Sequence, residues 1–285
     1  MGKVNVEAKK NYSEKIRVYK GKIEKIHRIE RNILAEIQKD PKSRASAYVV
    51  LSEEHLNLAA NYLLLNRISV SQLGIKNDSF LNDARKCCYE SIIYLEKIVT
   101  DQIDIPFSDL DEAWRSLAGL SDPKRYQLMN KLGFTIDSVM EGFGENTKWK
   151  WSFVDLNGRY AVVLKNIINF RTIIPGLDPR IQDYQIRYKL LAMVKQLLNK
   201  SANDFRLKYE LSSKRIDDFR TAIRFLTVLF RVYNLLGEND LAEGVKKKII
   251  TWKQKMEDDA KKEKTNSAQH QGSSVQRGSV KRRKS

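Results

Sequence analysis

The sequence predicts an all-α protein, either an irregular multi-helix bundle or a short array of α-hairpins. Glycine and proline are scarce, with 13 and 5 among 285 residues, whereas chains rich in tight turns usually need more of both. Apolar residues recur at three- and four-residue steps over most of the chain, which is the spacing of one helix face. Hydrophobic residues make up 42% and charged residues 31%, which fits a folded chain with a sizeable core.

The clearest pattern predicts a long first helix over about residues 12–39. Its apolar positions repeat every ~3.5 residues, as in a coiled-coil or helix-hairpin seam, and Glu30 takes one slot where an apolar residue is expected. Asn11 followed by Glu14 fits a capping box, and Asp40-Pro41 would end the helix. Such a stripe cannot be buried by one helix, so it predicts contact with the same chain or with another. We call these positions the N-terminal stripe: Tyr12, Ile16, Tyr19, Ile23, Ile26, Ile33 and Ile37.

Two more helices are expected before residue 100, and an interrupted region follows them. Residues 45–66 and 78–99 both carry apolar residues at helical spacing. After the break at Ile105-Pro106, short helices are expected to begin near Ser108 and Ser121. Glycines at 133, 142 and 144 then loosen the chain before Trp149. This region is predicted to be a subdomain boundary or a loop-rich surface.

Regular helices are predicted again in the second half. One covers about residues 156–174 and ends at Pro175-Gly176. The next runs to about residue 200, and Asp178 and Pro179 are suited to be its N-cap and its first helical residue. Residues 212–236 are apolar almost all round, as is typical of the most buried helix. A turn at 237–240 leads to the last helix. Beyond about Lys264 the composition is rich in Ser, Gln, Gly, Lys and Arg, which predicts disorder.

Residues of about 223–250 resemble a tetratricopeptide-type helical hairpin. The matching residues are Leu226, Leu229, Tyr233, Leu236, Gly237, Ala242 and Ile249. The chain departs from that pattern at Phe230, where a small residue is usual, and at Lys246, where a large apolar one is usual. The resemblance implies a protein-binding scaffold rather than an enzyme.

The net charge of +17 is concentrated at the two ends of the chain. Residues 261–285 contain eight basic side chains and one acidic, and residues 9–31 contain nine basic and three acidic. The middle is close to neutral. Together with the helix pattern, this predicts four parts: a basic amphipathic helix at 1–40, helical subdomains at 41–145 and 146–264, and a disordered basic tail at 265–285.

Catalytic or metal-binding patterns are not found in the sequence. The histidines His27, His55 and His270 have no Cys, Asp or Glu at a recognised metal-ligand spacing. Cys87-Cys88 falls on an apolar helix face, where buried thiols are usual, although Arg85 and Lys86 nearby leave a redox role open. We therefore expect no enzyme activity, no cofactor and no metal.

Three segments are candidates for binding. Trp149 and Trp151 flank a lysine and could stack nucleobases or anchor a partner, or they could belong to the core. The basic residues around the N-terminal stripe allow three interpretations. They could form the solvent-exposed face of a helix that packs through the stripe, a surface that binds nucleic acid, or the polar face of a helix that lies at a membrane surface. The tail residues that would attract polyanions are Lys281, Arg282, Arg283 and Lys284.

These observations favour a non-enzymatic scaffold or adaptor that acts through helical protein–protein contacts and self-associates. The residues expected to make the contacts are Tyr12, Ile16, Tyr19, Ile23, Ile26 and Ile33. The alternative is a nucleic-acid-binding protein of the coat or packaging type, which would use the basic ends together with Trp149 and Trp151. The polar start and the absence of a long apolar run predict a cytoplasmic protein with no membrane span.

Overall fold

The computed structural model describes residues 6–40, 43–145 and 147–279, with side chains described up to residue 262. This part of the chain contains ten α-helices and no β-strand, which confirms the all-α prediction. The chain divides into two compact units, residues 1–197 and residues 198–285. The division falls within helix α8 (Tyr184–Lys208). The boundary expected near residue 146 lies instead inside the first unit.

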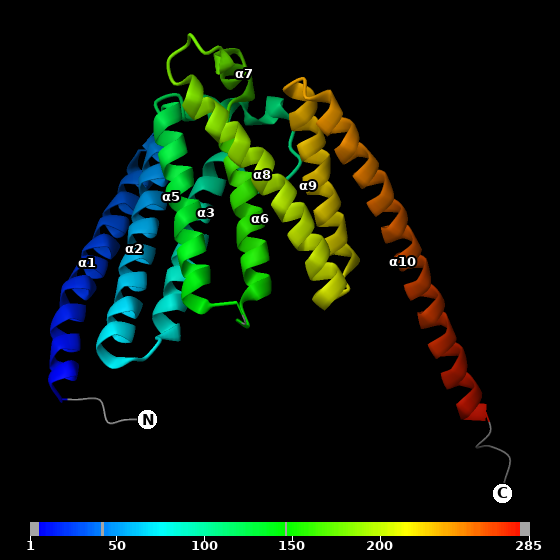
Figure 1. Ribbon diagram of the computed structural model, residues 1–285, viewed down its shortest axis with the longest axis horizontal. Helices are drawn as coiled ribbons and strands as arrows, with labels where there is room; N and C mark the ends of the chain where they lie inside the picture. Colours follow the sequence, from blue (N-terminus) through cyan, green and yellow to red (C-terminus); the bar gives the residue numbers. More distant parts are fainter. Residues whose placement is uncertain (1–5, 41–42, 146, 280–285) are drawn as a thin grey trace, which may run out of the picture. The chain divides into compact units, whose positions relative to one another are not determined.

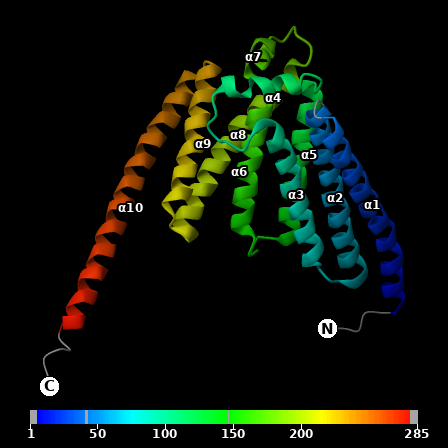
Figure 2. The same ribbon diagram turned by 180° about the vertical axis from the view of Figure 1, so that it is seen from behind.

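The first unit is a bundle of long helices around α3 (Figures 1 and 2). Helix α1 packs on α2, α2 packs extensively on α3, and α3 also contacts α5 and α6. The side chains of Leu51, Leu81, Ile92 and Leu132 are fully buried in its core. The helices are α1 (Val6–Lys39), α2 (Arg44–Leu73), α3 (Asp78–Val99), α4 (Asp111–Ser116), α5 (Asp122–Phe143), α6 (Lys150–Ile167), α7 (Phe170–Ile173) and the first part of α8.

Polar side chains fix the turns between these helices. Asn77 caps α3 by accepting hydrogen bonds from the backbone N–H groups of Ser79 and Phe80. The side-chain amide of Asn166, fully buried in α6, donates to the backbone oxygens of Thr100 and Gln102. The backbone oxygen of Asn166 accepts from the Trp114 indole N–H at 2.9 Å. The segment between α3 and α4, whose regular structure is limited to a 3-10 turn at Phe107–Leu110, is therefore anchored to α6.

The second unit contains the end of α8, a π-helical turn at Tyr209–Ser213, α9 (Ile216–Leu235) and α10 (Asn239–Ser279). Helices α9 and α10 form a hairpin, and Gly237 makes its turn with φ +70°. Stacked rings hold the helices together: Phe205 lies on Phe225, and Tyr209 lies on Phe219. Most apolar side chains of α9 are buried, as its all-round apolar pattern predicts.

Several helix ends differ from the sequence-based expectation. Helix α1 begins at Val6, so Asn11 and Glu14 lie inside it and form no cap. The expected helix at 156–174 is broken at Ile168–Asn169, where Asn169 caps the short helix α7. Helix α8 begins at Tyr184 rather than Pro179, because Asp178 accepts from the Arg180 backbone N–H in a local turn and Asp183 has φ +64°. Helix α10 continues past Lys264 to Ser279.

None of the described helices combines the length and the apolar content that crossing a bilayer requires.

Candidate interaction surface on the first helix

The N-terminal stripe faces α2 of the same chain. Ile23 and Ile26 are each 8% exposed, and Ile37 is 6% exposed. The remaining members, Tyr12, Ile16, Tyr19 and Ile33, are half-buried. Of the two partners that the pattern allowed, the structure therefore places the same chain against the stripe. Contact is closest in the second half of α1, and the stripe is less covered towards Tyr12.

Glu30 forms a polar cluster within this apolar interface. Its Oε1 atom accepts a hydrogen bond from the Tyr94 hydroxyl of α3 at 2.9 Å and lies 2.9 Å from His55 Nε2 of α2. Its Oε2 atom lies 3.3 Å from His27 Nδ1 on α1 itself. Since a carboxylate can only accept, both imidazoles donate to it. The residue that interrupts the stripe thus links three helices.

Hydrogen bonding controls the ionisation of this cluster. Burial alone would raise the pKa of Glu30, but the hydrogen bonds from His55, Tyr94 and His27 outweigh it and lower the pKa below its usual value of 4.5. The Tyr94 pKa is raised, first by burial and then by the hydrogen bond to Glu30. At neutral pH the cluster therefore holds an ionised carboxylate. In the sequence this cluster is indicated only by Glu30, an acidic residue at a position where the stripe calls for an apolar one. The spacing of residues did not identify the histidine and tyrosine partners of Glu30.

The opposite face of α1 is open and basic. At about 3.6 residues per turn, Lys10, Arg17 and Arg28 lie opposite the stripe, and Lys20, Lys25 and Arg31 lie beside them. All six are exposed. Within the described part of the chain, none of these side chains has an ion-pair or hydrogen-bond partner. The basic residues therefore form a row about 30 Å long, which we call the basic face of α1, and the exposed Glu14 and Glu24 lie on the same side of the helix.

The interface beside the basic face contains a shallow groove. Lys22, Lys25 and Ile29 of α1 line it on one side and Asn57 and Leu64 of α2 on the other, around a cavity of about 370 Å³. Lys22 also lies 5.1 Å from the centre of the Tyr19 ring. Positive charge and partly exposed apolar surface thus meet along the same edge of α1.

The two tryptophans are both half-buried and lie at the start of α6. The Arg85 guanidinium lies 4.1 Å from the centre of the Trp149 ring, and the Phe143 ring lies 6.4 Å from it. Arg85 is held there by a hydrogen bond to the Ser152 hydroxyl at 2.7 Å. One partner of Trp151 is Lys150, whose ammonium lies 5.3 Å from the ring centre. The Trp149 ring is therefore already engaged by an arginine.

The other candidate residues fall into two groups. The basic residues 281–284 lie outside the described residues. The cysteines are buried, and burial raises the pKa of the Cys87 thiol to about 12 and that of Cys88 further. Within the described residues there is no group of His, Cys, Asp and Glu side chains that could hold a metal ion.

Comparisons with known proteins give one family match. A search of curated proteins found no match. A chain from the computational design of self-assembling cyclic protein homooligomers aligns over 89% of this chain and 96% of its own length, with 11% identity and a TM-score of 0.27, which is too low to support an inference about fold or function. Residues 8–260 match the model of the TP0443 family.

Proposed function

The chain belongs to the TP0443 family, and we propose that it is a non-enzymatic scaffold or adaptor that acts through helical protein–protein contacts and self-associates. Helix α1 is the proposed contact element. Its outer edge combines half-buried stripe residues with the basic face, which suits an acidic protein surface or a second copy of the chain. The proposed location is the cytoplasm.

The observation that carries this proposal is the one-sided packing of α1. The helix packs mainly on α2 and reaches Tyr94 of α3, while its other side is covered by no described residue. Lys10, Arg17 and Arg28 lie on one side of the helix and form no ion pair among the described residues, although the exposed Glu14 and Glu24 lie on the same side. The net positive charge of this side can be neutralised by a partner. An edge helix with this arrangement is available for contact without unfolding the bundle.

Self-association is proposed through Tyr12, Ile16 and Tyr19. These three stripe residues are only half-buried against α2, whereas Ile23 and Ile26 are buried within the chain. A second subunit can therefore cover the first three at little cost to the fold, but it cannot reach the other two.

Sedimentation of a double variant tests this assignment. Tyr12→Asp with Ile16→Asp should convert an oligomer to a monomer, because an aspartate buried at the contact would have no partner. The matched control is Val18→Asp, since Val18 lies on the same helix turn but is 60% exposed and off the stripe. Equal masses for the double variant and the control would refute the contact.

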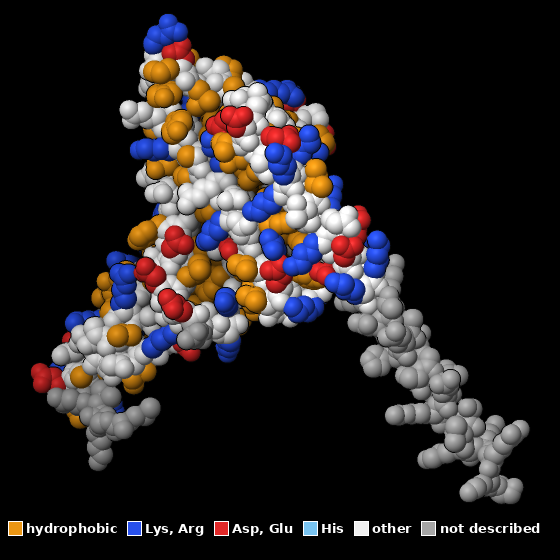
Figure 3. Space-filling view, turned by 45° about the vertical axis from the view of Figure 1, so that its right-hand side comes forward, with side chains coloured by type: hydrophobic (Ala, Val, Ile, Leu, Met, Phe, Trp, Pro, Cys, Tyr) orange, Lys and Arg blue, Asp and Glu red, His pale blue; other side chains and the backbone are white. Residues whose placement is uncertain are grey.

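Nucleic-acid binding is the second candidate, and the basic face of α1 favours it. A row of unpaired cations about 30 Å long matches the reach needed to contact several phosphates. Two observations weigh against it as the main function. Lys and Arg are interspersed with Asp and Glu over the face of the molecule seen in Figure 3, and Arg85 already lies on the Trp149 ring.

A charge-reversal experiment separates the two candidates. Arg17, Lys20 and Arg28 are changed to Glu, and the matched control changes the exposed α10 residues Lys247, Lys253 and Lys262 to Glu. Binding to a labelled nucleic-acid duplex is measured by anisotropy over a range of salt. If nucleic acid is the ligand, the α1 variant alone loses roughly tenfold or more in affinity, with a shallower salt slope. Equal losses in both variants would indicate nonspecific attraction only.

A further inference from the structure

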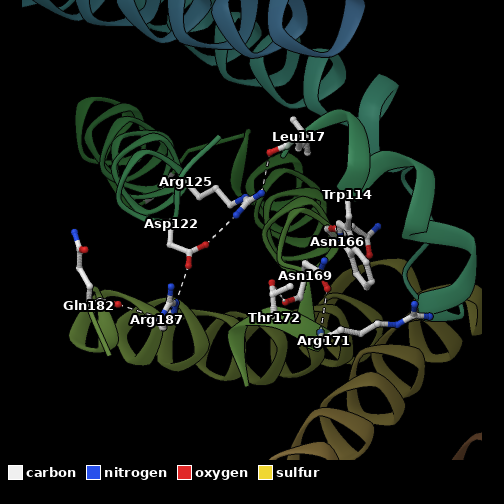
Figure 4. A network of polar contacts seen from close by, with 10 residues as sticks. All are labelled: Trp114, Leu117, Asp122, Arg125, Asn166, Asn169, Arg171, Thr172, Gln182 and Arg187. Atoms are coloured by element: carbon white, nitrogen blue, oxygen red, sulfur yellow. Dashed lines mark hydrogen bonds and ion pairs between the residues drawn. The ribbon is translucent and has the colours of Figure 1, made fainter. Parts of the chain in front are cut away.

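A polar cavity of about 640 Å³ lies in the first unit, at the end of the bundle where α4, α5, α7 and the start of α8 meet. Figure 4 shows part of its lining, with Asp122 between Arg125 and Arg187 and with the Arg171 side chain extending away from these three. The volume of the cavity lies within the range of pockets that hold small organic molecules, ~300–1,000 Å³. Its charged lining residues are four arginines and three aspartates: Arg115, Arg125, Arg171, Arg187, Asp111, Asp122 and Asp183.

The inner wall is fixed by Asp122, the first residue of α5. Its carboxylate accepts from Arg125 Nη1 at 2.8 Å and from Arg187 Nε at 2.8 Å. Arg125 also donates to the Leu117 backbone oxygen at 3.0 Å, and Arg187 donates to that of Gln182 at 3.0 Å. Both guanidinium groups are thus held in place by at least two acceptors each, so this wall is preorganised.

The wall nevertheless has more hydrogen-bond donors than acceptors. Each guanidinium carries five N–H donors, and Arg171 uses only Nη1, which donates to Asp111 at 3.0 Å. Arg115 is exposed and its side chain has no partner among the described residues. Arg125 is 9% exposed, and its Nε atom is buried without a hydrogen-bond partner among them. The Asn169 side chain accepts from the Arg171 backbone N–H, which leaves its amide N–H₂ free to donate.

Two of the three lining carboxylates are already paired with arginines. Asp111 and Asp122 are paired with arginines, and Asp183 is the remaining acid. An ion-pair network that served only to hold the loops together would need Arg125, Arg187 and Asp122. It would also use the pair of Arg171 with Asp111, which joins α7 to α4, but it would not need Arg115 beside the same space. The surplus donors therefore indicate an acidic ligand with several acceptor oxygens.

We propose that this cavity binds a small molecule through a phosphate group, with Arg115 and Arg171 contacting the phosphate at the mouth and Arg187 behind them. A phosphate offers acceptor oxygens in several directions and pairs with guanidinium groups in bidentate geometry. The cavity exceeds the size of a phosphate ion, and Trp114, Ala118 and Leu120 supply apolar wall for the rest of an organic ligand. The site uses no residue of α1 and is independent of the proposed scaffold function.

Calorimetric titration with two probes tests the proposal on the full chain. Phenyl phosphate and inorganic phosphate are each titrated at constant ionic strength. Both should bind if the phosphate group is recognised. Tighter binding of phenyl phosphate would identify an organic phosphate as the ligand, and equal binding would identify free phosphate. No binding of either probe overturns the proposal.

Variants at the mouth of the cavity locate the binding. Arg171→Gln and Arg115→Gln should each weaken phenyl phosphate binding by roughly tenfold or more, because each removes a charge-assisted hydrogen bond. The matched control is Arg220→Gln, since Arg171 and Arg220 side chains are both 60% exposed and both ion-paired with an aspartate. Arg171→Lys keeps the positive charge and loses the bidentate hydrogen bonding of the guanidinium group. The affinity of this variant for phenyl phosphate should therefore lie between those of the wild type and Arg171→Gln. Equal affinities in all these variants would place the phosphate elsewhere and overturn the site.

Discussion

Glu30 shows how one residue controls both the register of α1 and its response to pH. It accepts from Tyr94 and from two imidazoles, and its side chain is only 19% exposed. A single polar position in an otherwise apolar interface specifies which neighbours must lie opposite it. Two of the three donors, His55 and Tyr94, come from α2 and α3, so a shift of α1 along α2 would separate the carboxylate from both.

Glu30→Gln should lower the free energy of unfolding by about 1–3 kcal/mol at neutral pH, because three charge-assisted hydrogen bonds lose their charge. The pKa of Glu30 is lowered in the fold, so its contribution is present above its ordinary value of 4.5 and is lost as pH falls through the lower, folded-state pKa. Urea unfolding at several pH values should therefore show the difference between wild type and variant shrinking below pH 4.5.

Tyr94→Phe is the control for this prediction, since it removes one donor and keeps the ring that packs on Tyr48. Tyr94→Phe should lower the free energy of unfolding by about 1 kcal/mol, which is less than the effect of Glu30→Gln. A pH-independent difference for Glu30→Gln would show that the side chain contributes packing alone.

Cys87 and Cys88 are expected to be unreactive in the folded chain. Cys88 is fully buried and Cys87 is 8% exposed, and burial raises the pKa of Cys87 to about 12. At pH 8 the nucleophilic thiolate is therefore scarce as well as inaccessible. Iodoacetamide should label neither cysteine until denaturant is added, as mass spectrometry can check. Rapid labelling of the native chain would reopen the redox role that Arg85 and Lys86 suggested.

At the scale of the element, α1 and α2 form a helical hairpin that depends on the buried half of the N-terminal stripe. Ile23→Asp should destabilise the chain by about 3 kcal/mol or more, because an unpaired charge would lie in the interface with α2. Arg28→Glu on the opposite face should change stability by less than about 0.5 kcal/mol. Thermal unfolding followed by circular dichroism compares them, and similar effects would contradict the assignment of the two faces.

Replacement by alanine should have opposite effects on stability at two glycines that lie within helices, Gly21 and Gly133. A Cβ at Gly133 of α5 would lie 2.9 Å from the Tyr160 hydroxyl, which is buried and donates to the Met129 backbone oxygen at 2.8 Å. A Cβ at Gly21 of α1 would meet nothing within 4 Å. Gly21→Ala should therefore stabilise by about 0.5–1 kcal/mol through helix propensity.

Gly133→Ala should destabilise by about 1 kcal/mol or more, since the tyrosine must move against its hydrogen bond. Denaturant midpoints of the two variants measure both effects. Stabilisation by both substitutions would mean that α5 and α6 adjust freely at this contact.

The sequence predicted helices better than it predicted their ends. The stripe of α1, the apolar periodicity of α3 and the all-round apolar α9 are local patterns, and the structure has helices at all three. The start of α8 depended on Asp178 hydrogen-bonding to Arg180 in a turn instead of capping a helix. The break between α6 and α7 depended on Asn169 capping a separate turn. These choices between two local hydrogen bonds leave no trace in apolar spacing.

In the whole molecule, the pairing of charges and the formation of cavities depend on which residues far apart in the sequence come close in space. The sequence alone does not give these distances. The basic face of α1 was visible as nine basic residues within 9–31, and only its lack of partners had to come from the structure. The arginine-lined cavity was not predicted, because its residues are spread over positions 111–187 and meet only when α4, α5, α7 and α8 converge.

If the chain self-associates through α1, its mass in solution must exceed that of one chain, and this mass can be measured on the wild-type protein. Light scattering after size exclusion is measured in low and high salt, with and without nuclease treatment. We expect a mass well above the 33.1 kDa of one chain in every condition, with no ultraviolet signature of nucleic acid. A mass of one chain throughout, or a larger mass that disappears with nuclease or salt, would contradict it.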